Sequence, residues 1–81
     1  SAPTYTTVTR ASSEGSMKTV TKSVTGVTAT NHVFSSPAPA STIDAANSLI
    51  YVSAQGSGTL TFTCGNDAPS NSVTFNIRIE E

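Results

Sequence analysis

The chain has 81 residues, a formal net charge of −1 and only 11% charged residues, with a single cysteine and a single histidine. One cysteine excludes an intrachain disulfide, and one Cys with one His is too few for a structural zinc site. The four Lys and Arg residues form no basic patch, which argues against nucleic acid as a partner. No apolar run approaches the roughly 20 residues that cross a bilayer, so no membrane insertion is expected.

A chain of this length forms a small core, so support from self-association or from a larger assembly is expected. Serine and threonine account for 27 of the 81 residues, and valine is frequent. Many β-branched residues and few charges predict an all-β protein with a hydroxyl-covered surface. The length fits a single domain over residues 1–81.

The first predicted strand covers residues 3–10, PTYTTVTR, which are rich in Thr, Tyr and Val. In an extended chain, Tyr5 and Thr7 lie on one face and Val8 lies on the other. The Ser, Glu and Gly of residues 11–16 then predict a loop.

A second strand region is predicted over residues 17–27, MKTVTKSVTGV, with Lys22 between two valines on one face. A lysine in that place is typical of a sheet edge, where charge discourages pairing with other chains. Residues 27–34, VTATNHVF, alternate again and predict a third strand after a break near Gly26. Its predicted apolar face carries Val27, Ala29 and Val33.

Prolines interrupt residues 35–41, SSPAPAS, and remove backbone donors, which argues against a central strand there. We expect this segment to cross one end of a sandwich. Residues 41–48, STIDAANS, predict one helical turn around Asp44, capped by Ser41 or Thr42.

The last third carries the clearest strand patterns of the chain. Residues 49–55 are β-branched and aromatic, and residues 56–58, GSG, predict a hairpin turn into a strand at residues 59–64. That GSG lacks the lysine and the following helix of a phosphate-binding loop. A turn is predicted over residues 65–71, GNDAPSN. Residues 72–80 alternate strictly, and their predicted apolar face carries Val73, Phe75, Ile77 and Ile79.

Together these patterns predict a small antiparallel β-sandwich of about six or seven short strands, Ig-like or jelly-roll-like. The strands within residues 49–80 are expected to form a closing three-stranded meander. Such a sheet has one dry face and one face toward water or a neighbouring subunit.

The single cysteine, Cys64, shares the apolar face of its predicted strand with Leu60 and Phe62. A catalytic cysteine needs a basic partner and some exposure. We therefore interpret Cys64 as a buried thiol that packs like a small hydrophobic side chain. The alternative is an intermolecular disulfide across an oligomer axis.

The single histidine, His32, together with Asp44 and a serine would supply the residue types of a catalytic triad. A triad is defined by geometry, however, and the sequence has no nucleophile elbow. His32 alternates with Val33 and is expected to face solvent or an interface. We therefore predict no enzyme activity, no catalytic residue and no cofactor.

Polar residues of the last turn and of the C-terminal end are candidate metal ligands. Asn66, Asp67 and Asn71 offer oxygens to calcium but lack the ligand number and spacing of known calcium loops. Side chains of this kind usually bond to their own turn backbone. Glu80 and Glu81 are expected to form a solvated tail, so no metal site is predicted.

Three aromatic residues, Tyr5, Phe34 and Tyr51, could form a platform on which a sugar stacks. The chain has five aromatic residues and no tryptophan, which makes core or subunit-interface positions the simpler interpretation. The sequence alone assigns no binding residue.

Three segments over about residues 20–80 follow one another as VTGVTATNHVFSSPAPAS, LIYVSAQGSGTLTFTC and PSNSVTFNIRIE. In this order they resemble a small C-terminal-type β-domain of tailed-bacteriophage virion proteins. That domain occurs at the ends of tail-fibre, collar and other appendage proteins. Residues 1–16 lie outside the resemblance and are expected to form an arm or the first strand.

The resemblance implies a non-enzymatic structural protein located in a bacteriophage virion. It would be either an appendage head domain that binds a receptor or a capsid decoration protein, assembled as a symmetric oligomer, usually a trimer. Its partners would be its own copies, other virion proteins or a host-surface receptor. The alternative is a secreted bacterial Ig-like module that binds carbohydrate or matrix, because the same architecture serves both functions.

Overall fold

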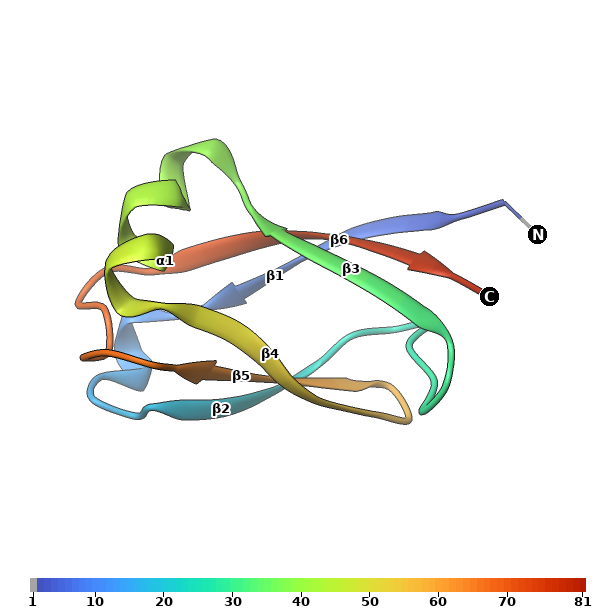
Figure 1. Cartoon of the computed structure of the whole chain (residues 1–81), viewed down its shortest axis with the longest axis horizontal. Coiled ribbons are helices and arrows are strands. Elements are labelled where there is room, and N and C mark those ends of the chain that lie inside the picture. The colour runs from blue at the N-terminus through green and yellow to red at the C-terminus, as the bar shows by residue number, and fades with distance from the viewer. Residues whose placement is uncertain (1) are drawn as a thin grey trace.

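Two three-stranded antiparallel sheets pack face to face in the computed structural model, which describes residues 2–81 (Figure 1). Over this range the predicted all-β sandwich is confirmed. Its strands are β1 (Thr4–Arg10), β2 (Thr19–Ser23), β3 (His32–Pro37), β4 (Ile50–Gly56), β5 (Thr59–Cys64) and β6 (Val73–Glu80). Its helical elements are η1 (Ser12–Glu14), η2 (Pro39–Ser41) and α1 (Thr42–Ser48). Within the described range no helix has the length and apolar character needed to cross a bilayer.

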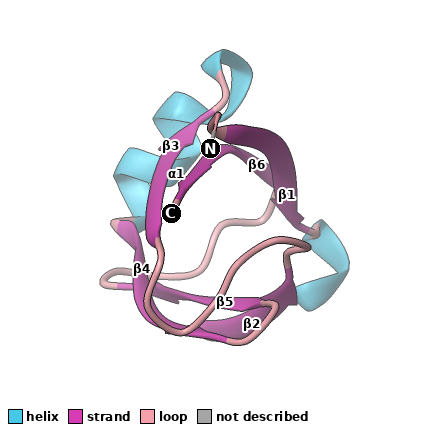
Figure 2. Ribbon diagram, turned by 90° about the vertical axis from the view of Figure 1, so that its right-hand side faces the viewer, coloured by secondary structure: helices cyan, strands magenta, loops and turns pink. Residues whose placement is uncertain are grey.

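The strand order is β1-β6-β3 in one sheet and β2-β5-β4 in the other. Figure 2 shows the two sheets as separate layers, with β6 and β5 central. Within residues 2–81, only the connection from β4 to β5 joins neighbours in one sheet, and each of the others crosses between sheets. The predicted arm or first strand is β1, which pairs with β6 from Thr4↔Ile79 to Arg10↔Val73. Ser1, also part of that prediction, lies outside the described residues.

The predicted three-stranded meander over residues 49–80 is wrong. The strands β4 and β5 form the expected hairpin, but β6 belongs to the opposite sheet. Hairpin loops usually have about 2–5 residues, whereas residues 65–72 form a longer link. This link can span the separation of about 10 Å between packed sheets. A strand with one dry face fits either sheet, so alternation alone does not choose between them.

The core lies between the sheets and follows the alternation of the central strands. Val73, Phe75, Ile77 and Ile79 of β6 are buried, as predicted, and face the buried side chains of β5. The rings of Phe62 in β5 and Phe75 in β6 stack with their centroids 4.9 Å apart. This pair joins the two central strands across the sandwich.

The third predicted strand, residues 27–34, is largely a loop, because β3 begins only at His32. Val27 is buried, but it lies in a turn that binds the β4–β5 hairpin, where Gly58 N–H donates to the Val27 carbonyl at 2.7 Å. Gly26 permits this turn with a φ of 98°. Ala29, predicted on the same face, is exposed. The tertiary contact with the hairpin therefore outweighs the β-propensity of the segment.

The helical segment is longer than the predicted single turn and is capped differently. Ser41 precedes α1, but its hydroxyl accepts a hydrogen bond from Thr74 N–H of β6 at 2.9 Å and makes no cap bond. Leu49 ends the helix in the left-handed conformation, with a φ of 50°. The helix therefore closes one end of the sandwich and is fastened to β6.

Cys64 is buried at the end of β5 and pairs with Ile50 in the strand register, which agrees with its interpretation as a core residue. We expect Cys64→Ser to lower the free energy of unfolding by about 1–3 kcal/mol, because the hydroxyl loses water without gaining a partner. Urea denaturation measures this loss, and Cys64→Ala is the matched control for volume. A Cys64→Ser protein as stable as wild type would contradict the assignment of Cys64 to the core.

Candidate functional site

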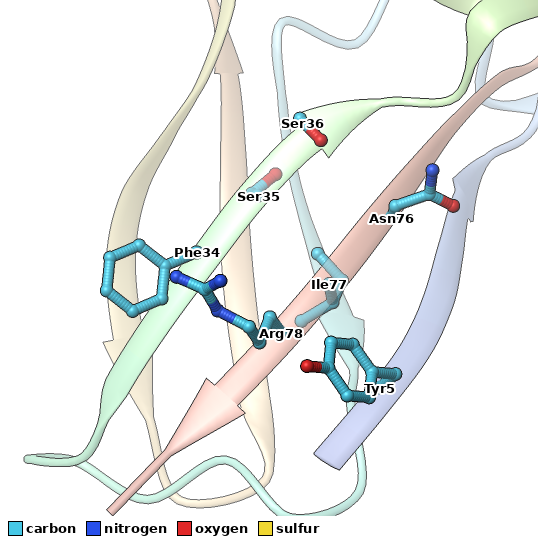
Figure 3. A pocket seen from close by; sticks show the side chains of 7 residues that line it. All are labelled: Tyr5, Phe34, Ser35, Ser36, Asn76, Ile77 and Arg78. Carbon is cyan, nitrogen blue, oxygen red and sulfur yellow. The ribbon is translucent and has the colours of Figure 1, made fainter. Parts of the chain in front are cut away.

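An open hollow of about 310 Å³ lies on the outer face of the β1-β6-β3 sheet (Figure 3). All three strands of the sheet contribute to it. It is lined by Tyr5, Phe34, Ser35, Ser36, Asn76, Ile77 and Arg78. We call the outward-pointing members of this set, Tyr5, Phe34, Ser36, Asn76 and Arg78, the Arg78 face.

The strand register brings these residues together from three distant parts of the chain. Tyr5 of β1 and Phe34 of β3 are the two cross-strand neighbours of Arg78 in β6. In the row two residues along, Asn76 pairs with Ser36 of β3. Since side chains in a strand alternate between faces, the buried neighbour Ile77 leaves both rows on the outside. Tyr5 is 71% exposed and Phe34 is 47% exposed.

Arg78 is held in place by two neighbours. The centre of its guanidinium lies 4.5 Å from the centroid of the Phe34 ring, which is a cation–π contact. Its Nε lies 3.1 Å from Oε2 of Glu80 in an ion pair. Figure 3 shows the guanidinium directed from β6 toward Phe34. Its two Nη groups make no hydrogen bond to any residue of the range 2–81.

The aromatic platform considered from the sequence is only partly assembled. Tyr5 and Phe34 flank Arg78, but Tyr51 belongs to β4 in the other sheet. Tyr51 lines a second groove of about 300 Å³ that runs between the β3 and β4 edges down to the stacked phenylalanines. Two of the three aromatic residues therefore share a site, and the third does not.

His32 lies at the beginning of β3, and the acidic residue Glu80 lies at the end of β6. His32 is exposed and pairs in register with Glu80, as expected for a histidine facing solvent. Glu80 was predicted to be part of a solvated tail, but it belongs to β6 and forms the ion pair with Arg78. The alternation predicted over residues 72–80 already put Arg78 and Glu80 on one face of the strand, but alternation does not show whether two charged groups meet.

The residues of the hypothetical catalytic triad are not brought together. His32 begins β3, whereas Asp44 lies in α1 beyond the other end of that strand. The Asp44 carboxylate instead accepts a hydrogen bond from the Asn71 side chain at 3.2 Å.

The hypothetical calcium ligands are likewise not all brought together, because Asn66 and Asp67 line one small hollow and Asn71 does not line it. Asn66 donates from its side chain to the Asn47 carbonyl at 3.1 Å, while Asn71 bonds to α1. Lys18 lines the same hollow as Asp67 and brings a positive charge to it. Across residues 2–81 no three His, Cys, Asp or Glu side chains are grouped so that they could hold a metal ion.

The outer face of the β2-β5-β4 sheet is covered by hydroxyl groups. Thr61 of β5 bonds through its hydroxyl to that of Thr21 at 3.0 Å, and Thr63 bonds to that of Ser53 at 2.6 Å. These pairs satisfy one another across the strands, as threonine pairs do in antiparallel sheets. The threonines of the TLTFTC segment therefore form a bonded polar surface, and Tyr51, the register partner of Thr63, is exposed beside them.

One buried charge was not anticipated from the sequence. Arg10, at the end of β1, is 2% exposed, and its Nη2 donates to the Gly15 carbonyl at 2.9 Å and to the Met17 carbonyl at 2.7 Å. Its Nε and Nη1 are buried without a hydrogen-bond partner among the described residues. Arg10 thus ties the η1 loop to the sheet. The alternation in residues 3–10 already placed Arg10 on the Val8 face, which was the available signal.

Glu14 of η1 lies close to this buried charge and pairs with Lys22 of β2. Its Oε1 accepts a hydrogen bond from the Ala11 N–H at 2.6 Å. Burial by itself would raise the pKa of the Glu14 carboxyl. The hydrogen bonds from Lys22 and Ala11, with the positive charge of Lys22 and Arg10, outweigh burial and lower that pKa below its ordinary value of 4.5.

This lowered pKa predicts a stability contribution that depends on pH. Because the folded pKa lies below the unfolded one, the contribution is complete above pH 4.5 and is lost as the pH falls through the folded value. We expect Glu14→Gln to differ most from wild type near neutral pH and to converge with it in acid. Urea denaturation of both proteins from pH 7 to pH 2 measures the difference. A difference that grows toward acid would contradict the assignment.

Comparisons of this chain with protein-family models, with curated proteins and with solved structures found no match. The Arg78 face is therefore assigned from its own geometry. Sequence alternation already placed Arg78 on the polar side of its strand, but its aromatic neighbours became visible only with the register of β1 and β3.

Proposed function

We propose that this chain is a non-enzymatic structural module of a bacteriophage virion that works by surface contact through the Arg78 face. The observation that carries the contact role is the exposed row Tyr5–Arg78–Phe34 across the β1-β6-β3 sheet. Tyrosine and arginine are among the residues that contribute most to binding energy when a partner covers them. A rigid sheet holds them in fixed relative positions, which lowers the entropy cost of binding.

The location in a virion is supported by the resemblance of the segments over residues 20–80 to small domains of tailed-phage virion proteins. Within that class the chain is either an appendage head domain, such as that of a tail fibre, or a capsid decoration protein. In both cases the module forms a symmetric oligomer, with a trimer favoured, and contacts other virion proteins or a host-surface receptor. A small core of this kind gains support from its neighbours in an assembly, which suits a part of a virion.

Sedimentation of the purified chain tests this proposal. We expect a symmetric oligomer, or a chain that cosediments with capsids, with tail parts or with host envelopes. Tyr5→Ala should weaken such cosedimentation, while Tyr51→Ala, an exposed tyrosine on the other sheet, should not. A strictly monomeric chain without affinity for any of these particles would overturn the proposal.

A second candidate function is favoured by the same aromatic pair. Tyr5 and Phe34 are exposed beside a hollow that carries polar side chains, which suits a secreted Ig-like carbohydrate- or matrix-binding module. A glycan array probed with wild type and with Tyr5→Ala tests this candidate. Wild-type protein that binds no glycan would remove it.

A further inference from the structure

Building on the proposed contact role, we infer that the Arg78 face binds an acidic sugar, namely a pyranose ring that carries a carboxylate. In this arrangement Arg78 takes the carboxylate and Tyr5 supplies a surface for the ring. Asn76 and Ser36 lie in the next row of the sheet, within the same hollow, and offer hydrogen bonds to sugar hydroxyls.

The contacts that the Arg78 guanidinium makes, and those that it leaves open, indicate that its ligand carries a carboxylate. Phe34 lies against its face and Glu80 takes its Nε, so the group is already oriented before a ligand arrives. The two Nη groups make no hydrogen bond within the range 2–81, and its side chain is 45% exposed. A planar guanidinium whose two Nη groups are available pairs with a carboxylate through two parallel hydrogen bonds.

The surroundings of Arg78 point to a sugar ring. The Tyr5 ring is 71% exposed, and the negative face of an aromatic ring attracts the weakly positive C–H groups of a pyranose. A volume of about 310 Å³ suits one or two small rings, and it lies at the lower end of the usual size of ligand pockets. An amide and a hydroxyl at the other end of the hollow match a ligand with many hydroxyl groups.

A second copy of the chain fits this face less well. Two copies that pack this face together around a twofold axis bring the residues near that axis close to their own counterparts. Because β6 is the central strand of its sheet, Arg78 would then lie near the partner's Arg78. Like charges facing one another oppose association, whereas a carboxylate complements the guanidinium.

An NMR titration of the ¹⁵N-labelled protein with glucuronic acid and galacturonic acid tests the inference, with glucose and galactose as neutral counterparts. We expect the acidic sugars to shift amide signals of β1, β3 and β6 and the neutral sugars to bind more weakly. Arg78→Gln should weaken binding about tenfold or more, the loss expected for a hydrogen bond to a charged group. Tyr5→Ala should also weaken binding, because the sugar ring loses its aromatic surface. Arg78→Lys keeps the positive charge but loses the two parallel N–H donors of the guanidinium, and it should also weaken binding.

Matched controls separate this site from general effects of charge and aromatic content. Lys18→Gln removes an exposed cation elsewhere, and Tyr51→Ala removes an exposed tyrosine from the other sheet. Both should bind acidic sugars as wild type does. If they weaken binding as strongly as the Arg78 and Tyr5 variants do, the assignment of the site is wrong.

The remaining outcomes distinguish this inference from the proposed function. Equal binding of acidic and neutral sugars would overturn the role of Arg78. Binding of virion parts or host envelopes without binding of any acidic sugar would overturn the inference and leave the proposed function standing. An oligomer that dissociates in the Arg78→Gln protein, again without sugar binding, would identify the face as an interface between copies and would also overturn the inference.

Discussion

Phe62→Ala is expected to lower the free energy of unfolding by about 3–5 kcal/mol, which is the usual cost of removing a buried phenylalanine ring. Phe62 is 2% exposed and its ring stacks on Phe75 at 4.9 Å. The two residues lie on the central strands of opposite sheets, so the substitution opens a cavity where the sheets are joined. A domain of this size has a total stability of only about 4–12 kcal/mol. The substitution therefore removes a large fraction of the total stability, and the variant should unfold at a clearly lower urea concentration than wild type.

Urea denaturation followed by circular dichroism measures this effect, and Phe34→Ala is the matched control. Phe34 is exposed on the outer face of β3, and its substitution removes mainly the contact with Arg78. Its cost should stay within about 1 kcal/mol. If the two variants lose similar stability, the sheets are not held together by the Phe62–Phe75 pair.

Arg10→Ala is expected to lower the free energy of unfolding by about 2–5 kcal/mol, comparable with the truncation of a large buried aliphatic side chain. The substitution leaves a cavity between the sheets and removes the donors to the Gly15 and Met17 carbonyls. The loop around η1 should then open more often. Hydrogen exchange at residues 11–17 should accelerate together with the loss of global stability.

Arg10→Met separates the volume of this side chain from its charge. Methionine fills much of the same space and removes a guanidinium whose Nε and Nη1 lack partners among the described residues. Since a poorly paired buried charge is itself costly, Arg10→Met should be markedly less destabilising than Arg10→Ala. Arg78→Ala, at an exposed arginine, serves as the surface control. A methionine variant as unstable as the alanine variant would mean that the two carbonyl bonds, and not packing, dominate.

Much of the local structure could be predicted because it depends on alternation. Residues 59–64 and 72–80 each carry a dry face, and both became strands with Leu60, Phe75 and their neighbours buried. The GSG turn and the break near Gly26 follow from residues that allow tight turns. The burial of Cys64 was predictable for the same reason, since its neighbours on that face are apolar.

The predictions failed where a choice depended on distant partners. Residues 27–31 have the composition of a strand, but the β4–β5 hairpin binds their backbone in a turn. The sheet to which β6 belongs, the end of the sandwich closed by α1 and the burial of Arg10 also depend on contacts between segments far apart in the chain. Propensity describes a residue and its neighbours, and such contacts lie outside its reach.

The candidate site, too, was predictable from the sequence only in part. Alternation along the chain is enough to place Tyr5 and Arg78 on the polar faces of their strands, because successive side chains point to opposite sides of a sheet. The position of β6 between β1 and β3 became visible only in the folded protein. This position puts Tyr5, Arg78 and Phe34 in one row and leaves Tyr51 on the other sheet. Alternation cannot predict this arrangement, because strand order and register are set by packing of the whole core, to which every strand contributes.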